Sequence, residues 1–439
     1  MIKLNETNNG RNYYMKKKNE YKISILILML IIYPLFMPRS LKLLYSPLID
    51  GIESTNELYV VCGIVLIMLI IGVFRRPKGI SSITVSKLSI ICFLYVCFIV
   101  INTLINTQFN EQNIYAMVVT VVPLMFLVIP QKCFAKENNL FIKFASLIAV
   151  IYSLLAIYNT THSSLNIGNA YVISASQARV SLPIGSPTTV VFYFIASLPL
   201  VNLSLCEETH KVLSLVYRIG FWLIILASLL SLSRAGAAVI IVIAAWCLYN
   251  RSKKTILAKR ILGIFVLIAI GVYATSFIAS KFDFSRLFMG FSDSSVSERT
   301  RGTMLFLEIF KHNPVFGSGC GEFFTRVYTS LTFSDRIITA YGKVGLVDPH
   351  NGFVLMLSEN GIIGFIFLVI IIYMIYKHYS LIADQDTKSA ALQLLAGIVV
   401  YTLASSDLFN LIGLTSIIYL YLSYFISVSR CDYIENREI

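Results

Sequence analysis

The sequence predicts an all-α, polytopic membrane protein with about twelve transmembrane helices and one large outer loop that contains short helices. Three observations predict this class. Of the 439 residues, 57% are apolar and only 13% are charged, whereas a soluble domain has about 25% charged residues. The mean hydropathy is +0.76. Apolar runs long enough to cross a bilayer recur along the chain. This composition excludes a cytosolic enzyme, a disordered chain and a secreted disulfide scaffold.

The predicted spans follow one another with short connections and one long gap. In chain order they cover residues 23–37, 58–74, 88–105, 114–130, 140–158, 189–205, 216–232, 235–249, 261–279, 353–376, 390–404 and 408–426. The first resembles a secretory signal, but Met37-Pro38-Arg39 follows it without small cleavage-site residues, so we predict a retained helix. The chain then divides into a tail (1–22), nine helices (23–279), a large outer loop (280–350), three helices (351–427) and a second tail (428–439).

Lysine and arginine are unevenly distributed between the connections. Alternate connections are basic: the N-terminal tail, Arg75-Arg76, Lys132 with Lys136, Lys211, and the cations between Arg251 and Arg260. The short loops between them hold only Arg39, Lys42, Arg179 and Arg234. The positive-inside rule therefore places both termini in the cytoplasm and the long loop outside. The formal net charge is +13, but there are too few charged residues to coat a nucleic-acid groove, which argues against nucleic acid, and we predict no nucleic-acid partner.

The predicted spans are nearly free of ionisable residues, which argues against ion-coupled transport. The sequence also contains no Walker A motif, no dinucleotide-binding fingerprint, no HExxH and no Cys/His cluster with metal-ligand spacing. We therefore predict neither a cofactor nor a metal. The polar residues that remain lie mainly on the predicted outer side.

Two outer arginines lie at span entrances. Arg179 precedes a Pro/Gly-containing turn, which could hold its guanidinium rigidly at the membrane surface; an ordinary interfacial anchor is the alternative. Arg234 follows Ser233 in a tight apolar turn between two spans. An arginine is costly at a lipid-facing position, so we expect Arg234 to face a water-filled cavity or an anionic ligand rather than extend to the interface.

The long loop contains two further features. Ser297-Glu298-Arg299-Thr300-Arg301 precedes an expected helix over 303–310, and a glycine-rich turn with Gly317, Gly319 and Gly321 follows it. The backbone N–H groups of such a turn, with nearby arginines, could cradle phosphates, but for a glycine-rich turn taken alone we favour a purely structural role. At the end of the loop, His350-Asn351 enters a span, and Glu359-Asn360-Gly361 follows about two turns later. His350 could orient or deprotonate an acceptor hydroxyl, or be an ordinary surface histidine.

The combination of these motifs resembles the O-antigen ligase/polymerase superfamily. It consists of the turn Ser233-Arg234-Ala235-Gly236, Arg299 before Pro314, Gly317-x-Gly319-x-Gly321-x-Phe323, His350-Asn351, and Glu359-x-Gly361-x-x-Gly364. The resemblance covers roughly residues 170–375. The sequence departs from the usual pattern in having Ser186-Pro187-Thr188 where many members have Asn-Pro-Asn, and Thr303 where an aromatic residue is frequent.

The resemblance implies a glycosyltransferase of the bacterial inner membrane that acts without metal or nucleotide sugar. It implies transfer of a glycan from undecaprenyl diphosphate at the periplasmic face, with Arg234 and Arg299 on the donor diphosphate and His350 on the acceptor. Arg179, Arg301, Gly319, Asn351 and Glu359 are the expected substrate-binding residues. The expected partners are the carrier-linked glycan, the bilayer, and a chain-length regulator or flippase of the same pathway.

The resemblance leaves the reaction open between two transfers. A polymerase joins lipid-linked repeat units to a growing chain, and a ligase moves the finished chain to lipid A–core. We favour the polymerase because polymerases are the more numerous and diverse members. Protein-glycosylating members, a non-catalytic scaffold and a flippase or other transporter are the remaining alternatives.

Overall fold

A computed structural model describes residues 86–107, 111–128, 139–161, 187–231, 233–251, 294–321, 349–410 and 412–438. Every regular element within these ranges is a helix, which confirms the predicted all-α class. The predicted spans 23–37, 58–74 and 261–279 and the candidate Arg179 lie outside the described residues.

The described helices are, in chain order, α3 (Lys87–Asn106), α4 (Glu111–Val128), α5 (Asn139–Thr161), α6 (Pro187–Glu207), α7 (Lys211–Leu230), α8 (Arg234–Arg251), α11 (Ser294–His312), α13 (Gly352–Ser380), α14 (Gln385–Thr402), α15 (Asp407–Asn410) and α16 (Ile412–Glu438). Within the described ranges, 6 helices are long and apolar enough to cross a membrane, namely α3, α5, α6, α7, α8 and α13. α4 and α16 contain shorter apolar stretches. The total of twelve spans stays a prediction.

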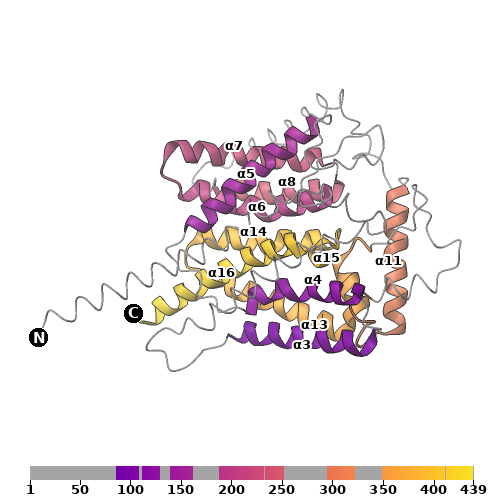
Figure 1. The fold of residues 1–439 in the computed structure, drawn as a ribbon. Helices are drawn as coiled ribbons and strands as arrows, with labels where there is room; N and C mark the ends of the chain where they lie inside the picture. Colours follow the sequence, from indigo (N-terminus) through magenta and orange to yellow (C-terminus); the bar gives the residue numbers. More distant parts are fainter. Residues whose placement is uncertain are drawn as a thin grey trace, which may run out of the picture.

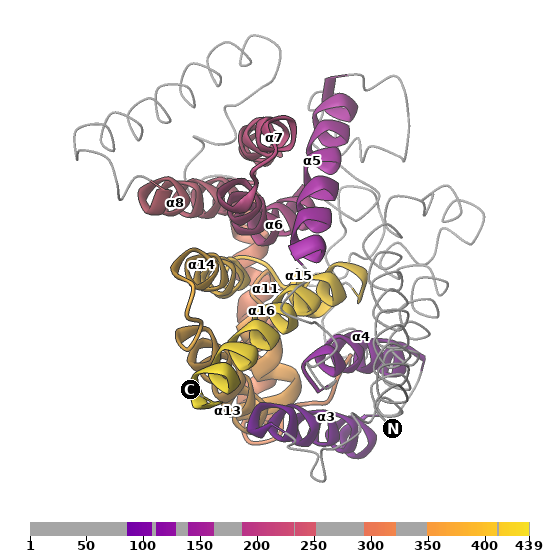
Figure 2. The same cartoon turned by 90° about the vertical axis from the view of Figure 1, so that its left-hand side faces the viewer.

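α6 is the central helix of the bundle. It packs against α5, α7, α8 and α14, and Figure 2 shows it surrounded by them. Every side chain from Thr189 to Ser204 is buried. The outer helices instead leave large apolar side chains uncovered, including Phe93 and Ile105 on α3 and Leu215 on α7. A helix that is apolar on all sides is stable when helices or lipid surround it, so these outward faces fit a bilayer.

Short connections make successive helices antiparallel. Residues 208–210 join α6 to α7, residues 231–233 join α7 to α8, and residues 381–384 join α13 to α14. The helix termini therefore gather at two ends of the bundle. α11 lies across one of them, which we call the α11 end (Figure 1). The other is the Lys211 end, where α7 begins and α8 and α13 terminate.

Two helix boundaries differ from the sequence-based expectation. Residues 297–301 lie inside α11, which begins at Ser294, so the expected start near Thr303 was wrong. Serine is favoured at helix N-termini, and the run Ser294-Ser295 fits the earlier start. The single span expected over 408–426 is divided into the short helix α15 and the longer α16.

Candidate functional site

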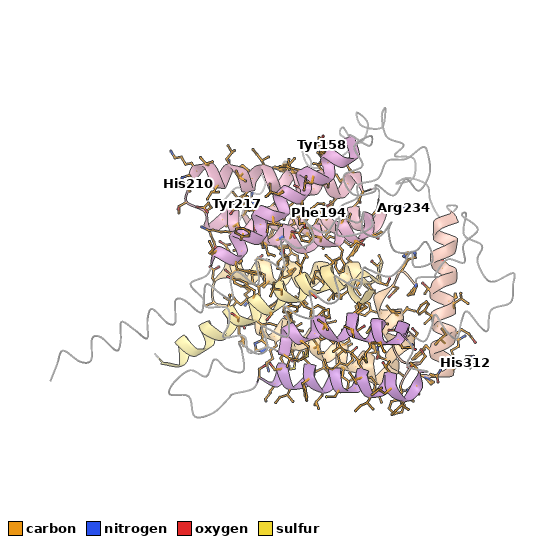
Figure 3. The ribbon with its side chains drawn as sticks, in the orientation of Figure 1. Tyr158, Phe194, His210, Tyr217, Arg234 and His312 are labelled. Atoms are coloured by element: carbon orange, nitrogen blue, oxygen red, sulfur yellow. The ribbon has the colours of Figure 1, made fainter. Side chains whose placement is uncertain are left out.

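The described candidate residues are found at or near the α11 end of the bundle. Arg234 is the first residue of α8, and Figure 3 places it at this end, whereas His210 lies at the Lys211 end. The others lie on α11, in the loop after it, or at the start of α13: Arg299, Arg301, Gly319, His350, Asn351 and Glu359. Segments that are far apart in the sequence thus lie at one end of the bundle, where α11 packs against α13.

A turn of small residues fixes the position of Arg234. The Ser233 hydroxyl oxygen accepts a hydrogen bond from the Gly236 N–H at 3.3 Å, which caps α8. A Cβ on Gly236 would come within 2.3 Å of Cγ1 of Val191 in α6, so α8 begins in close contact with α6. Arg234 is half-buried. Its charge adds to the positive end of the helix dipole, and the two together favour an anion at this position.

One hydrogen bond ties α11 to the segment that precedes α13. The Thr303 hydroxyl donates to the carbonyl oxygen of Pro349 at 3.0 Å. His350 follows with a φ of 50°, and among the described residues it is the only non-glycine residue with a positive φ. This left-handed backbone is strained for a residue with a side chain and persists where the surrounding structure holds it. α11 therefore helps to fix the backbone of His350.

Asn351 is the N-cap of α13. Its side-chain oxygen accepts hydrogen bonds from the N–H groups of Phe353 and Val354 at 3.0 and 3.2 Å. The N–H of Gly352, the residue directly after Asn351, donates to the carbonyl oxygen of Ser405 at 3.2 Å. Ser405 lies in the connection between α14 and α15. The segment that contains His350 is thus held from three directions: by α11, by its own helix and by the end of α14.

α13 is broken at Gly361, which has φ 62° and ψ −166°. The loop after α11 supplies partners for the backbone groups that the break releases. The N–H groups of Ser318 and Gly319 donate to the carbonyl oxygens of Ser358 and Glu359, at 2.9 and 2.8 Å. The N–H groups on the other side of the break, of Ile362 and Ile363, donate to Pro314 and Val315, at 2.9 and 3.2 Å. Two lost helical hydrogen bonds are thus replaced by four bonds to the loop.

The two backbones approach too closely for side chains at the crossing. A Cβ on Gly361 would lie 2.3 Å from the carbonyl oxygen of Val315. A Cβ on Gly317, whose φ is 76°, would lie 2.4 Å from the carbonyl carbon and oxygen of Glu359. Both glycines have backbone conformations that other residues rarely adopt. The pairing of the loop with α13 therefore requires glycine on both sides, and we call residues 314–319 together with 358–363 the loop–helix junction.

The Glu359 carboxylate holds the end of this loop. Its Oε1 accepts a hydrogen bond from the Gly321 N–H at 2.9 Å, and the side chain is buried. Asn102 of α3 donates to the carbonyl oxygen of Glu359 at 3.1 Å. Burial and the Glu359 carboxylate raise the pKa of the Cys320 thiol well above its usual range. The thiol is therefore neutral at physiological pH and unsuited to act as a nucleophile.

The hydrogen bonds of the glycine-rich turn agree with a structural role. All five N–H groups from Gly317 to Gly321 already donate to protein acceptors: Asn313 O, Ser358 O, Glu359 O, Thr103 Oγ1 and Glu359 Oε1. They do not form an open phosphate cradle, and the turn supports α13 instead. The roles in substrate binding expected for Gly319, Asn351 and Glu359 stay predictions. The break was not predicted from the sequence, although three polar or small residues in a row within an apolar run, Glu359-Asn360-Gly361, are a signal for one.

One known family matches part of the chain. Residues 219–369 match the family described as O-antigen ligase. The match begins within α7, includes α8 and α11, and ends within α13 beyond the loop–helix junction. It confirms the resemblance to the O-antigen ligase/polymerase superfamily and contains every candidate residue except Arg179. A search of curated proteins gave no match.

Proposed function

Because residues 219–369 carry a domain of the O-antigen ligase family, whose members are glycosyltransferase-like membrane enzymes, we propose that the protein is a surface-polysaccharide polymerase. It transfers glycan from undecaprenyl diphosphate to the end of a lipid-linked repeat unit, at the outer face of the bacterial inner membrane. The α11 end is then the periplasmic end, and both chain termini are cytoplasmic. We propose that the reaction needs no metal.

The donor diphosphate is held by arginines at the α11 end. Breaking the bond between sugar and diphosphate develops negative charge on the leaving group, and fixed guanidinium groups stabilise that charge. Arg234 at the positive end of α8 suits this role. Arg299 and Arg301 on α11 supply further positive charge, and Arg179 is the fourth proposed ligand.

His350 is the residue that we propose acts on the acceptor. It either takes the proton of the acceptor hydroxyl or positions that hydroxyl by a hydrogen bond. The observation that carries the proposal is the Thr303–Pro349 hydrogen bond. Position 299 lies one helical turn before Thr303 and on the same face of α11. This single contact therefore brings the helix that carries Arg299 against the backbone that holds His350.

The test is complementation of a strain in which the gene is deleted, with analysis of the surface glycan. Loss of a polymerase leaves single repeat units on lipid A–core. Arg234→Ala and His350→Ala should each fail to restore long chains, because they remove charge stabilisation and the acceptor contact, while Lys311→Ala, an exposed residue of α11, should restore them. Normal chains from both site variants at normal protein levels would contradict the proposal.

Ligase activity is the second candidate, and the description of the matching family favours it. The same deletion separates the two reactions. A lost ligase leaves no glycan on lipid A–core and long chains on the carrier lipid. A flippase would instead leave carrier-linked units on the cytoplasmic side. We also expect contact with a chain-length regulator or flippase of the same pathway, which cross-linking in membranes tests.

A further inference from the structure

A second cluster of arginines lies at the Lys211 end, where the proposed reaction does not use it. A cavity of about 430 Å³ opens between α6, α7, α8 and α14. Its lining residues are Leu205, Cys206, Ser214, Arg218, Asn250, Arg251 and Asp386. Two guanidinium groups, an amide and a hydroxyl thus line one cavity with a single carboxylate.

Arg251 is held in place before any ligand binds. Its Nε and Nη2 both donate to the side-chain oxygen of Asn202 in α6, at 3.1 and 2.6 Å. Its guanidinium carbon lies 5.2 Å from the centre of the Phe221 ring of α7. A guanidinium fixed in this way loses little conformational entropy when it binds an oxyanion with its remaining N–H groups.

Arg218, unlike Arg251, is not held in place by hydrogen bonds to the described residues. It lies about 10 Å along α7 from the helix start at Lys211, and it makes no hydrogen bond or ion pair with the described residues. An arginine two turns inside an apolar helix is costly against lipid tails, so its presence favours a polar partner at headgroup depth. The cavity beside it is large enough to hold that partner.

We propose that this cavity binds a phosphate group, that of an anionic phospholipid in the leaflet at the Lys211 end. The lipid source follows from the position: three of the four helices around the cavity, α6, α7 and α8, are long and apolar enough to cross a membrane, and basic cavities between such helices suit anionic headgroups. Arg251 is the preformed ligand, Arg218 closes on the phosphate, and Ser214 and Asn250 supply neutral donors. The negative charge of Asp386 weakens the binding of an anion.

The experiment measures lipid binding to the purified full-length protein by native mass spectrometry and by the shift in Tm. Phosphatidylglycerol is the probe, phosphatidylcholine the zwitterionic control and inorganic phosphate the lipid-free control. Arg218→Gln should weaken phosphatidylglycerol binding about tenfold, the expected loss for one charged hydrogen-bonding pair. Arg218→Lys should retain part of the affinity, and Asp386→Asn should increase it.

Lys211→Gln is the matched control, because Lys211 is an exposed cation on the same helix that does not line the cavity. It should bind the lipid as the unmodified protein does. Equal binding by Arg218→Gln, or an equal loss in both variants, overturns the site. Stabilisation by inorganic phosphate as large as that by phosphatidylglycerol overturns the lipid as its source. Because the readout is binding rather than glycan length, it is independent of the proposed reaction.

Discussion

α6 and α13 are both apolar helices of the bundle, but they differ in how they tolerate a helix-breaking residue. α6 contains Pro199 and remains one helix from Pro187 to Glu207. α13 contains no proline and is broken at Gly361. A proline removes one donor, and the surrounding helices of α6 can accommodate that loss. The glycine in α13 releases several backbone groups, and the loop after α11 provides a partner for each.

In these two helices the hydrogen-bond partners available to the backbone, more than local helix propensity, determine where the helix is continuous. α6 is enclosed by helices that offer side chains only. α13 lies beside a loop whose own N–H and C=O groups are available for pairing. The loop–helix junction also joins the end of α11 to α13, the two helices that carry or adjoin most of the candidate residues. The unbroken α6 instead forms the core of the bundle.

The largest effect is expected from adding side chains at the loop–helix junction. Gly361→Ala and Gly317→Ala each place a methyl group within 2.4 Å of a backbone atom, at a positive φ. The backbone strain together with loss of the replaced hydrogen bonds should cost several kcal/mol, on the order of 3–5. The measurement is the Tm and expression level of the purified variants. Pro199→Ala in α6 is the comparison, and a Tm loss as large as that of Gly361→Ala would contradict this account.

A smaller effect is expected at Glu359, which holds the loop by its side chain. Glu359→Ala leaves the buried N–H of Gly321 without its acceptor, which should cost about 1–3 kcal/mol of stability. Glu359→Gln keeps an oxygen at the same position and should retain most of the stability. The two variants are compared by denaturation in detergent. If Glu359→Gln is as unstable as Glu359→Ala, the hydrogen bond to Gly321 is not the reason for the loss.

Thr303 tests whether α11 acts on the site beyond its contribution to stability. Thr303→Val keeps the shape and removes one hydrogen bond to Pro349, about 1 kcal/mol. Because the contact fixes the backbone of His350, we expect shorter glycan chains at an unchanged protein level. Thr303→Ser keeps the hydroxyl and should restore chain length. Normal chains from Thr303→Val would show that α11 does not position His350.

The sequence predicted the helices better than it predicted their connections. Long apolar runs identify α3, α5, α6, α7 and α13 because burial in lipid or core requires them. The break in α13 was missed because its partner loop lies more than 30 residues earlier in the chain, and no local pattern contains that information. In the sequence, Thr303 stands out only as a departure from the family pattern. Its hydrogen bond to Pro349 could not be predicted, because the two residues are 46 positions apart.

For the same reason, the sequence singled out candidate residues but did not show which of their neighbours they contact. Arg234 was identifiable because an arginine in a tight apolar turn needs an explanation, and the structure places it at the α11 end. The sequence favoured a structural role for the glycine-rich turn but left a phosphate cradle open, because most acceptors of its N–H groups lie far away in the chain, on α13 and α3. A sequence shows which groups can bind a ligand, but the fold decides which of them are already paired.

The smallest expected effect concerns the Lys211 end of the bundle, where an ion pair holds the turn that follows α6. Nζ of Lys143 lies 2.8 Å from Oε2 of Glu208, and this hydrogen bond, with the N–H of His210, lowers the pKa of Glu208. A carboxyl group with a lowered folded pKa stabilises the protein above its unfolded pKa of about 4.3. That stabilisation is lost as the pH falls from there through the folded pKa.

Glu208→Gln should therefore lower the Tm slightly at pH 7 and leave it unchanged once the pH is below the folded pKa, because the unmodified carboxyl is then protonated. The difference at pH 7 should shrink in high salt, since Lys143 is partly exposed and its charge is screened. Glu308→Gln on α11 is the control at the α11 end. It removes a pair with Lys311 in which both side chains are exposed, so its effect on the Tm at pH 7 should be smaller than that of Glu208→Gln. A Tm difference between Glu208→Gln and the unmodified protein that is the same at every pH would mean that Glu208 acts through packing and not through its charge.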